Sequence, residues 1–172
     1  MKKLIAIFSI LLSMTVLFSQ DKKHLAFTSV DLDGNSVTEA IFTKNKLTML
    51  NIWGTFCPPC IREMPDLAKL SEAYKDKGFQ IIGLAVDASD RNGNVIPKIK
   101  TDALRIIEKT GANYTHIVPS KEMMNGFLRN VQAVPTTYFI DSQGNFISLP
   151  YLGAKSYSDW QQIVDSLLAK QK

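Results

Sequence analysis

The most informative stretch of this chain is LTMLNIWGTFCPPC, residues 47–60. Its first half, residues 47–53, is a mostly apolar run that is typical of a strand buried inside a sheet. The two prolines between the cysteines suit the first turn of a helix, where the backbone N–H groups have no helical partner. The stretch therefore predicts a strand that passes, within a few residues, into a helix that begins next to Cys57.

The two cysteines of this stretch are expected to form a redox-active pair. Cys57 falls at the N-cap of the predicted helix, where free N–H groups and the helix dipole stabilise a thiolate. Cys60 falls on nearly the same helical face, one turn deeper. We therefore expect a solvent-accessible Cys57 to attack a substrate disulfide, and a protected Cys60 to resolve the mixed disulfide that forms.

Two other roles for the pair stay open on the residues alone. A purely structural bridge across so short a loop contributes only about 2 kcal/mol through chain entropy, which is a weak reason to keep it in a domain of this size. A zinc site would need two more ligands, and the two histidines, His24 and His116, are distant in the sequence. Because His116 sits in a short apolar segment, it is expected to be a core or rim residue rather than a ligand, and no metal site is expected.

A carboxylate and a proline extend the candidate site. Glu63 falls on the apolar face of the helix predicted over residues 58–77, where burial would raise its pKa. Such a group can hold a proton for the deeper thiol; the alternative is a side chain that bends out to water. Pro135 opens a strand predicted over residues 136–140, and a cis bond there would turn the backbone of Val134 outward, toward an extended substrate.

The rest of the chain predicts strands that alternate with helices around a mixed sheet. With 172 residues, of which 45% are hydrophobic and 21% charged, the composition is that of one soluble domain. Further strands are expected at residues 25–30, from 37 onward, and at 79–86, 114–118 and 146–149, and further helices at 96–110, 122–129 and 156–170. Trp160 is expected to anchor the last helix, and the polar segment 87–97 to be a surface loop.

The first residues have the layout of a secretory signal. Two lysines precede fifteen residues without a charge, Leu4 to Phe18. This run is short for a membrane-spanning helix, which needs about 20 residues. Residues 1–19 are therefore expected to be a signal peptide, with an uncleaved anchor at residues 4–18 or an apolar first helix as the alternatives. Export predicts an extracytoplasmic, periplasmic location, in which thiols become oxidised.

The charge balance argues against nucleic acid as a partner. Removing Lys2 and Lys3 with the leader leaves 18 of the 20 basic residues, against 16 acidic ones. Proteins that bind nucleic acid instead carry a basic stripe or cluster. Nucleic-acid binding is therefore not expected, and membrane contact is expected only through an uncleaved leader.

The motifs WGTFCPPC at residues 53–60 and VPTT at residues 134–137 together resemble those of the thioredoxin superfamily. More narrowly, they resemble the exported TlpA/ResA-like thiol–disulfide oxidoreductases. The resemblance covers residues 25–171, which are expected to form one thioredoxin-like domain. It implies an α/β thioredoxin fold, with a central mixed β-sheet flanked by helices and an N-terminal β-hairpin extension. It also implies a cis bond before Pro135, which would lie against the cysteine pair.

The resemblance further implies a role for each residue of the site. Cys57, Cys60 and Glu63 are implied to be catalytic, the first two as a reversible disulfide and the third as the group that handles the proton. Asn51 stands where thioredoxin has a buried aspartate, so the resemblance implies that Glu63 handles the proton in place of that aspartate. The residues implied to bind substrate are Trp53, Pro58, Pro59, Val134 and Pro135.

The resemblance also implies what the protein works with. No cofactor is implied, because the cysteine pair itself carries the electrons. The implied partners are protein disulfide or thiol clients, with apocytochrome c as one candidate in cytochrome c biogenesis. A membrane thiol–disulfide carrier is implied to return electrons to the pair.

Two other functions are alternatives to a reductase. A peroxiredoxin-like peroxidase shares the fold but needs Thr three residues before its reactive cysteine and Pro seven before it, where this chain has Gly54 and Leu50. A non-catalytic thioredoxin-like binding module would keep the disulfide only as a structural bridge. The chain also departs from the family at Phe56, which is usually Trp, and at Pro58, which is Gly in the common CGPC motif. Its redox potential therefore does not follow from the resemblance.

Overall fold

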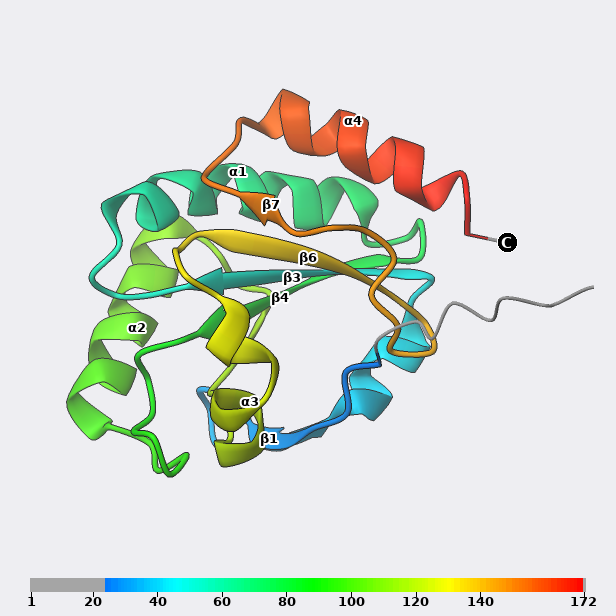
Figure 1. Ribbon diagram of the computed structural model, residues 1–172. Coiled ribbons are helices and arrows are strands. Elements are labelled where there is room, and N and C mark those ends of the chain that lie inside the picture. Colours follow the sequence, from blue (N-terminus) through cyan, green and yellow to red (C-terminus); the bar gives the residue numbers. More distant parts are fainter. Residues whose placement is uncertain (1–23, 172) are drawn as a thin grey trace, which may run out of the picture.

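The computed structural model describes residues 24–171 (Figure 1). The predicted signal peptide, residues 1–19, lies outside the described residues. The strands are β1 (Thr28–Val30), β2 (Ser36–Thr38), β3 (Leu47–Trp53), β4 (Phe79–Ala85), β5 (Thr115–Ile117), β6 (Thr136–Asp141) and β7 (Tyr151–Leu152). The helices are α1 (Pro58–Tyr74), α2 (Pro97–Thr110), α3 (Lys121–Asn125) and α4 (Tyr157–Leu168), with 3-10 helices η1 (Glu39–Lys44) and η2 (Phe127–Asn130).

These elements form the expected mixed sheet flanked by helices. Five strands pair in the order β5-β4-β3-β6-β7, and β1 and β2 form a separate antiparallel hairpin. Helices α1 and α4 lie over one face of the sheet, and α3 lies with β1 on the other side (Figure 1). Among residues 24–171, no helix combines the length and the apolar character that a membrane span requires.

The central strand β3 is buried along its whole length, because it lies between β4, which runs parallel to it, and β6, which runs antiparallel. This position explains its nearly continuous apolar sequence and confirms the predicted strand. Successive residues of a strand face opposite sides of the sheet. Leu50 and Ile52 pack in the core beneath α3, whereas Met49 packs with α1 and α4. Asn51 and Trp53 therefore face α1, the helix that carries the cysteines.

The helices begin and end at residues with a clear local reason. The predicted helix over 58–77 ends earlier, at Tyr74, because the chain makes a turn in which the Lys77 N–H binds the Tyr74 carbonyl oxygen (2.9 Å). The turn leads into Gly78, which has a φ of 75° that glycine adopts without steric cost. Helix α4 begins behind Ser156, whose side chain forms a capping box with Asp159.

The predicted strand at residues 146–149 is wrong. After a single bridge between Ile140 and Phe146 the chain leaves the sheet, and Leu149 is 86% exposed. The two residues of β7 pair with β6 in its place. Pro150 has no N–H to contribute to a ladder of hydrogen bonds, which favours this departure from the sheet.

The helix predicted over residues 122–129 is divided into α3 and η2. The division falls at Gly126, whose backbone angles (φ −101°, ψ −115°) lie outside the helical region. The 3-10 helix η1, which was not predicted, follows β2 and begins after Thr38, whose side chain accepts a hydrogen bond from the Ala40 N–H.

Three turns share one five-residue pattern, with Asp first, Gly fourth and Asn fifth, at residues 31–35, 90–94 and 141–145. In each turn, one aspartate oxygen accepts the backbone N–H groups two and four residues later, at 2.8 to 2.9 Å. The three glycines have φ values of 98°, 83° and 83°. The first of these turns closes the N-terminal hairpin, which confirms the predicted extension.

Candidate active site

The cysteine pair lies where β3 passes into α1. A turn closed by the Cys57 N–H and the Gly54 carbonyl oxygen (3.0 Å) leads into the helix. Cys57 is the N-cap of α1, and its Sγ accepts a hydrogen bond from the Cys60 backbone N–H at 3.2 Å. The two sulfurs form a disulfide, with the Cα atoms 5.3 Å apart. The predicted placement of Cys57 at the positive end of a helix is confirmed.

The expected difference in exposure between the two cysteines is wrong for this disulfide form. Cys57 is 4% exposed and Cys60 is 2% exposed. The Cys57 sulfur is covered because it is bonded to Cys60 and because the Val134 carbonyl oxygen lies 3.6 Å from it. The neighbouring Phe56 is 66% exposed, and Pro58 is also exposed. The N-cap position, and not exposure, therefore distinguishes Cys57 from Cys60.

The loop before β6 lies against the cysteine pair, although it is far away along the chain. Its Val134–Pro135 peptide bond is cis, as the resemblance implied. Because β6 runs antiparallel to β3, the start of β6 lies beside the end of β3, where Thr136 is opposite Ile52. The sheet thus brings the two sequence motifs together.

Glu63 is buried on the face of α1 that packs on the sheet, and it is 3% exposed. Its Oε1 accepts hydrogen bonds from the Trp160 indole N–H (2.7 Å) and the Lys155 backbone N–H (2.8 Å). Its Oε2 accepts a longer bond from Asn51 Nδ2 (3.5 Å). Burial raises the pKa of Glu63, although these hydrogen bonds oppose the shift. The predicted burial is confirmed, and the alternative in which the side chain bends out to water is wrong.

Trp53 supports the disulfide from the core. It is 0% exposed and packs in the same apolar cluster as Cys57 and Cys60. Its indole N–H donates to Nδ1 of His116 (3.1 Å), so Nε2 of His116 donates to the Ala112 carbonyl oxygen (2.9 Å). The predicted substrate contact of Trp53 is wrong, because a fully buried ring cannot touch a client. The core position predicted for His116 is confirmed.

The zinc alternative does not fit this arrangement. Both ring nitrogens of His116 are engaged in hydrogen bonds, and the two cysteine sulfurs are bonded to each other. Within residues 24–171, no group of three or more His, Cys, Asp and Glu side chains is placed to hold a metal ion.

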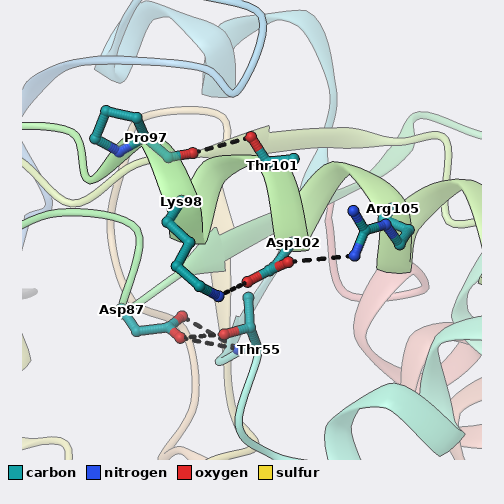
Figure 2. Close-up of polar contacts among 7 residues, drawn as sticks. All are labelled: Thr55, Asp87, Pro97, Lys98, Thr101, Asp102 and Arg105. Atoms are coloured by element: carbon teal, nitrogen blue, oxygen red, sulfur yellow. Dashed lines mark hydrogen bonds and ion pairs between the residues drawn. The ribbon is translucent and has the colours of Figure 1, made fainter.

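Asp87 holds the loop that leads to the cysteine pair, a role that was not predicted. Its carboxylate oxygens accept hydrogen bonds from the Thr55 backbone N–H (3.1 and 3.2 Å) and from the Thr55 hydroxyl (2.5 Å), as Figure 2 shows. Asp87 follows β4 and Thr55 follows β3, and these parallel strands end at the same edge of the sheet. An acidic residue directly after a buried parallel strand is the signal that could have indicated this contact.

Replacing Asp87 with alanine is expected to lower the free energy of unfolding by about 1–3 kcal/mol, because the half-buried Thr55 N–H and hydroxyl lose their acceptor. Urea denaturation measures the change. The matched control is Asp102→Ala in α2, whose carboxylate forms exposed ion pairs with Lys98 (2.7 Å) and Arg105 (3.5 Å), also drawn in Figure 2. Such surface pairs contribute about 1 kcal/mol or less. Equal losses in the two variants would contradict the holding role of Asp87.

The last helix contributes to the site in a way that was not predicted either. Trp160 does anchor α4, since its ring packs against Phe139 and Tyr151. Its indole N–H, however, binds Glu63, 97 residues away in the chain. A local pattern gives no signal of a contact over that distance.

Comparison with known proteins gives thiol-disulfide oxidoreductases among the relatives of this chain. The family model described as Redoxin matches residues 19–149. The thiol-disulfide oxidoreductase ResA of Halalkalibacterium halodurans is 33% identical over 123 residues, which cover 72% of this chain and 63% of that protein. A protein of the same name from Geobacillus thermodenitrificans is 28% identical over 142 residues, covering 82% of this chain and 74% of that protein. The chain thus spans less than two thirds of the length of the first of these relatives.

Solved structures share the architecture. A thiol:disulfide interchange protein of the thioredoxin family from Chlorobium tepidum TLS has a TM-score of 0.68 at 26% identity, covering 83% of this chain and 93% of that one. A DsbF homologue from Corynebacterium diphtheriae has a TM-score of 0.64 at 26% identity, covering 83% and 85%. These likenesses confirm the predicted thioredoxin fold.

Proposed function

Because the chain belongs to the Redoxin family, we propose that it is a thiol–disulfide oxidoreductase that acts as a reductant of protein disulfides. The observation that carries the proposal is the Cys57–Cys60 disulfide at the N-terminus of α1, with the cis Val134–Pro135 bond against it. A helix N-terminus stabilises the thiolate that disulfide exchange requires. A purely structural bridge would need neither this placement nor a buried carboxylate on the same helix face.

The reaction begins with the reduced pair. The Cys57 thiolate attacks one sulfur of the client disulfide, forms a mixed disulfide with it, and displaces the other client sulfur as a thiolate that takes up a proton. Cys60 then loses its proton, attacks the Cys57 sulfur and displaces the second client thiolate, which is protonated in turn. Two electrons pass to the client, and the Cys57–Cys60 disulfide is the oxidised product.

Glu63 is proposed to accept the proton of Cys60 at this resolving step. It lies on the same buried face of α1, one turn further along the helix. An ordinary carboxylate is a weak base for a thiol, because the pKa of a carboxyl group is much lower than that of a thiol. The raised pKa of Glu63 brings the two values closer together.

Replacing Glu63 with glutamine is expected to move the pH profile of thiol alkylation about one unit lower. The ionised carboxylate disfavours a neighbouring thiolate, and glutamine removes the charge while keeping the shape. Iodoacetamide modification of the reduced protein as a function of pH measures the shift. Glu72→Gln, an exposed change on the same helix, is the control and should leave the profile in place. An unchanged profile in Glu63→Gln would remove Glu63 from the mechanism.

The client is proposed to bind across the surface around the disulfide. Pro58 is exposed, and Pro59 and Val134 are half-buried, so these three residues can touch a client. Pro135 is buried and would act by shaping the loop. An extended client segment beside Val134 could bind its backbone as an added strand does. A polypeptide therefore fits this surface better than a small molecule.

We further propose that the protein works outside the cytoplasm, in an oxidising compartment such as the periplasm. The support is the basic and then apolar layout of residues 1–19. Its clients would be proteins whose cysteines have become oxidised, with apocytochrome c as one candidate. A membrane thiol–disulfide carrier would re-reduce the pair.

Insulin reduction tests the proposal against its alternatives. With dithiothreitol as the electron source, the wild-type protein is expected to speed the precipitation of insulin and to leave hydrogen peroxide unconsumed. Peroxide consumption that depends on Cys57 would favour the peroxiredoxin-like alternative, against which Gly54 and Leu50 argue. Acceleration of neither reaction would favour a binding module with a structural bridge.

A further inference from the structure

The two oxygens of the Glu63 carboxylate have different surroundings. Oε1 accepts two short hydrogen bonds, from the Trp160 indole N–H at 2.7 Å and from the Lys155 backbone N–H at 2.8 Å. Oε2 accepts one long bond, from Asn51 Nδ2 at 3.5 Å. The same Asn51 nitrogen donates a shorter bond, of 3.1 Å, to the Thr137 hydroxyl. Oε1 is therefore held by two donors, while Oε2 is weakly engaged.

This asymmetry bears on where a proton can reside. A carboxylate oxygen has two lone-pair sites, and both sites on Oε1 are used by N–H donors. A proton added to Oε1 would displace one of these donors, whereas a proton on Oε2 leaves both bonds in place. Uptake and release of a proton therefore cost least at Oε2.

The indole donor is fixed by contacts that do not involve Glu63. Trp160 is 0% exposed. Its ring packs edge to face against Phe139 and Tyr151, with centroids 6.2 and 5.8 Å apart. The ring is therefore held in place whether or not Glu63 carries a charge.

The backbone donor is anchored as well. The Gly153 N–H binds the carbonyl oxygen of Pro135 at 2.9 Å, two residues before the Lys155 N–H reaches Glu63. The connection between β7 and α4 thus touches both the cis-proline loop and the buried carboxylate.

We infer that Trp160 is a positioning residue for proton transfer: its indole N–H, together with the Lys155 backbone N–H, fixes Glu63 so that Oε2 exchanges the proton. The inference rests on the proposed function and deepens it, because it names the residue that orients the proton carrier and the oxygen that carries the proton. Without the indole N–H, Oε1 keeps one strong donor. The carboxylate is then less stable relative to the neutral carboxyl than it is in the wild-type protein.

Other ionisable groups face Glu63 from the elements around it. The side chains of Lys155, before α4, and Tyr114, beside β5, interact with it electrostatically, and Cys60 precedes it on α1. Strands β3 and β6 contribute an amide and a hydroxyl, neither of which titrates. A Trp160→Phe substitution leaves all of these groups in place, so a change in its pH behaviour reports the lost donor.

The test is the pKa of Glu63 in the oxidised full chain, measured from the side-chain ¹³C shift of labelled glutamate, with Glu63→Gln to assign the signal. Trp160→Phe is expected to raise this pKa by about one unit, a tenfold change in the ionisation equilibrium, because a hydrogen bond to the charged form is lost. Benzothienylalanine, introduced only at position 160, keeps the shape of the ring but has sulfur in place of the N–H. It should give the same shift, and it serves if phenylalanine does not fold.

Tyr151→Leu is the matched control, since it removes a ring packed on Trp160 but no donor to Glu63, and it should leave the pKa of Glu63 unchanged. The inference is overturned if neither change at position 160 shifts the pKa, or if Tyr151→Leu shifts it equally. A shifted pKa in a protein whose wild type does not reduce insulin would support the positioning role and contradict the proposed function. The two failures are therefore distinguishable.

Discussion

In the Cys57→Ser variant, insulin reduction is expected to fall at least about a thousandfold, to the rate of dithiothreitol alone. Serine offers no thiolate, and Cys60, one turn further along α1, does not occupy the N-cap position that stabilises the attacking thiolate. The Cys60→Ser variant is expected to behave differently, because its Cys57 still attacks while the mixed disulfide is not resolved. The two variants therefore separate the attacking sulfur from the resolving one, which burial does not do.

Non-reducing electrophoresis and mass spectrometry measure the difference. The Cys60→Ser variant should accumulate client adducts through Cys57 that dithiothreitol releases, and the captured proteins identify the clients. The variant with both cysteines replaced is the control and should capture nothing while still unfolding cooperatively. Adducts through Cys60 in the Cys57→Ser variant, or near wild-type insulin reduction by it, would contradict the assignment of Cys57 as the nucleophile.

Acidification is expected to cost the protein about 3 kcal/mol of unfolding free energy through His116 alone. Burial lowers the pKa of His116 from 6.5 to about 4, against the opposing effect of its bond to the Ala112 carbonyl. The folded protein thus binds this proton more weakly than the unfolded chain does. The contribution of His116 is therefore complete above pH 6.5 and is lost as the pH falls to about 4. Protonation of Nδ1 would also break the hydrogen bond that it accepts from the Trp53 indole N–H.

Urea unfolding across this pH range, with the disulfide intact, measures the effect. His116→Gln can keep one acceptor and one donor but does not titrate, so its stability should fall less steeply on acidification than that of the wild type. The other histidine, His24, is exposed, and His24→Gln is the control that should keep the wild-type slope. Glu63 acts in the opposite sense, since its raised pKa makes stability fall as the pH rises. The effect of His116 is therefore measured as the difference between the pH slopes of the variant and the wild type, in which the contribution of Glu63 cancels. Equal slopes in His116→Gln and wild type would contradict the prediction.

Much of the fold follows from patterns within single elements. The apolar runs at residues 47–53 and 79–86 predict β3 and β4 closely, because a strand covered on both faces must be apolar along its length. Prolines in the first turn mark the start of α1 for an equally local reason, whereas the helix ends at Tyr74, before the glycine that predicted its end. Helical spacing also places Glu63 on the same face as Cys60, one turn further along, but it leaves open whether the side chain is buried or bends out to water.

The predictions fail where two segments compete for the same partner. Residues 146–149 are mostly apolar and follow a turn signal, yet only Phe146 pairs with β6, and the first residues of β6 pair with β7 instead. The hydrogen-bond partner of Trp53 and the covering of Cys57 were not predicted either, because each depends on a segment from another part of the chain. Trp53 binds His116, and Cys57 lies under the Val134 carbonyl.

Local backbone geometry was enough to place two cysteines at the start of a helix and a carboxylate one turn below them. Long-range packing was needed to supply everything that surrounds these groups: the Asp87 carboxylate on Thr55, the cis-proline loop, and the donors of Trp160 and Lys155 on Glu63. The reason is physical. Spacing along a helix or strand is a short-range property that the chain repeats wherever the element forms. Hydrogen bonds between elements arise only after the strand order has brought distant segments to one edge of the sheet.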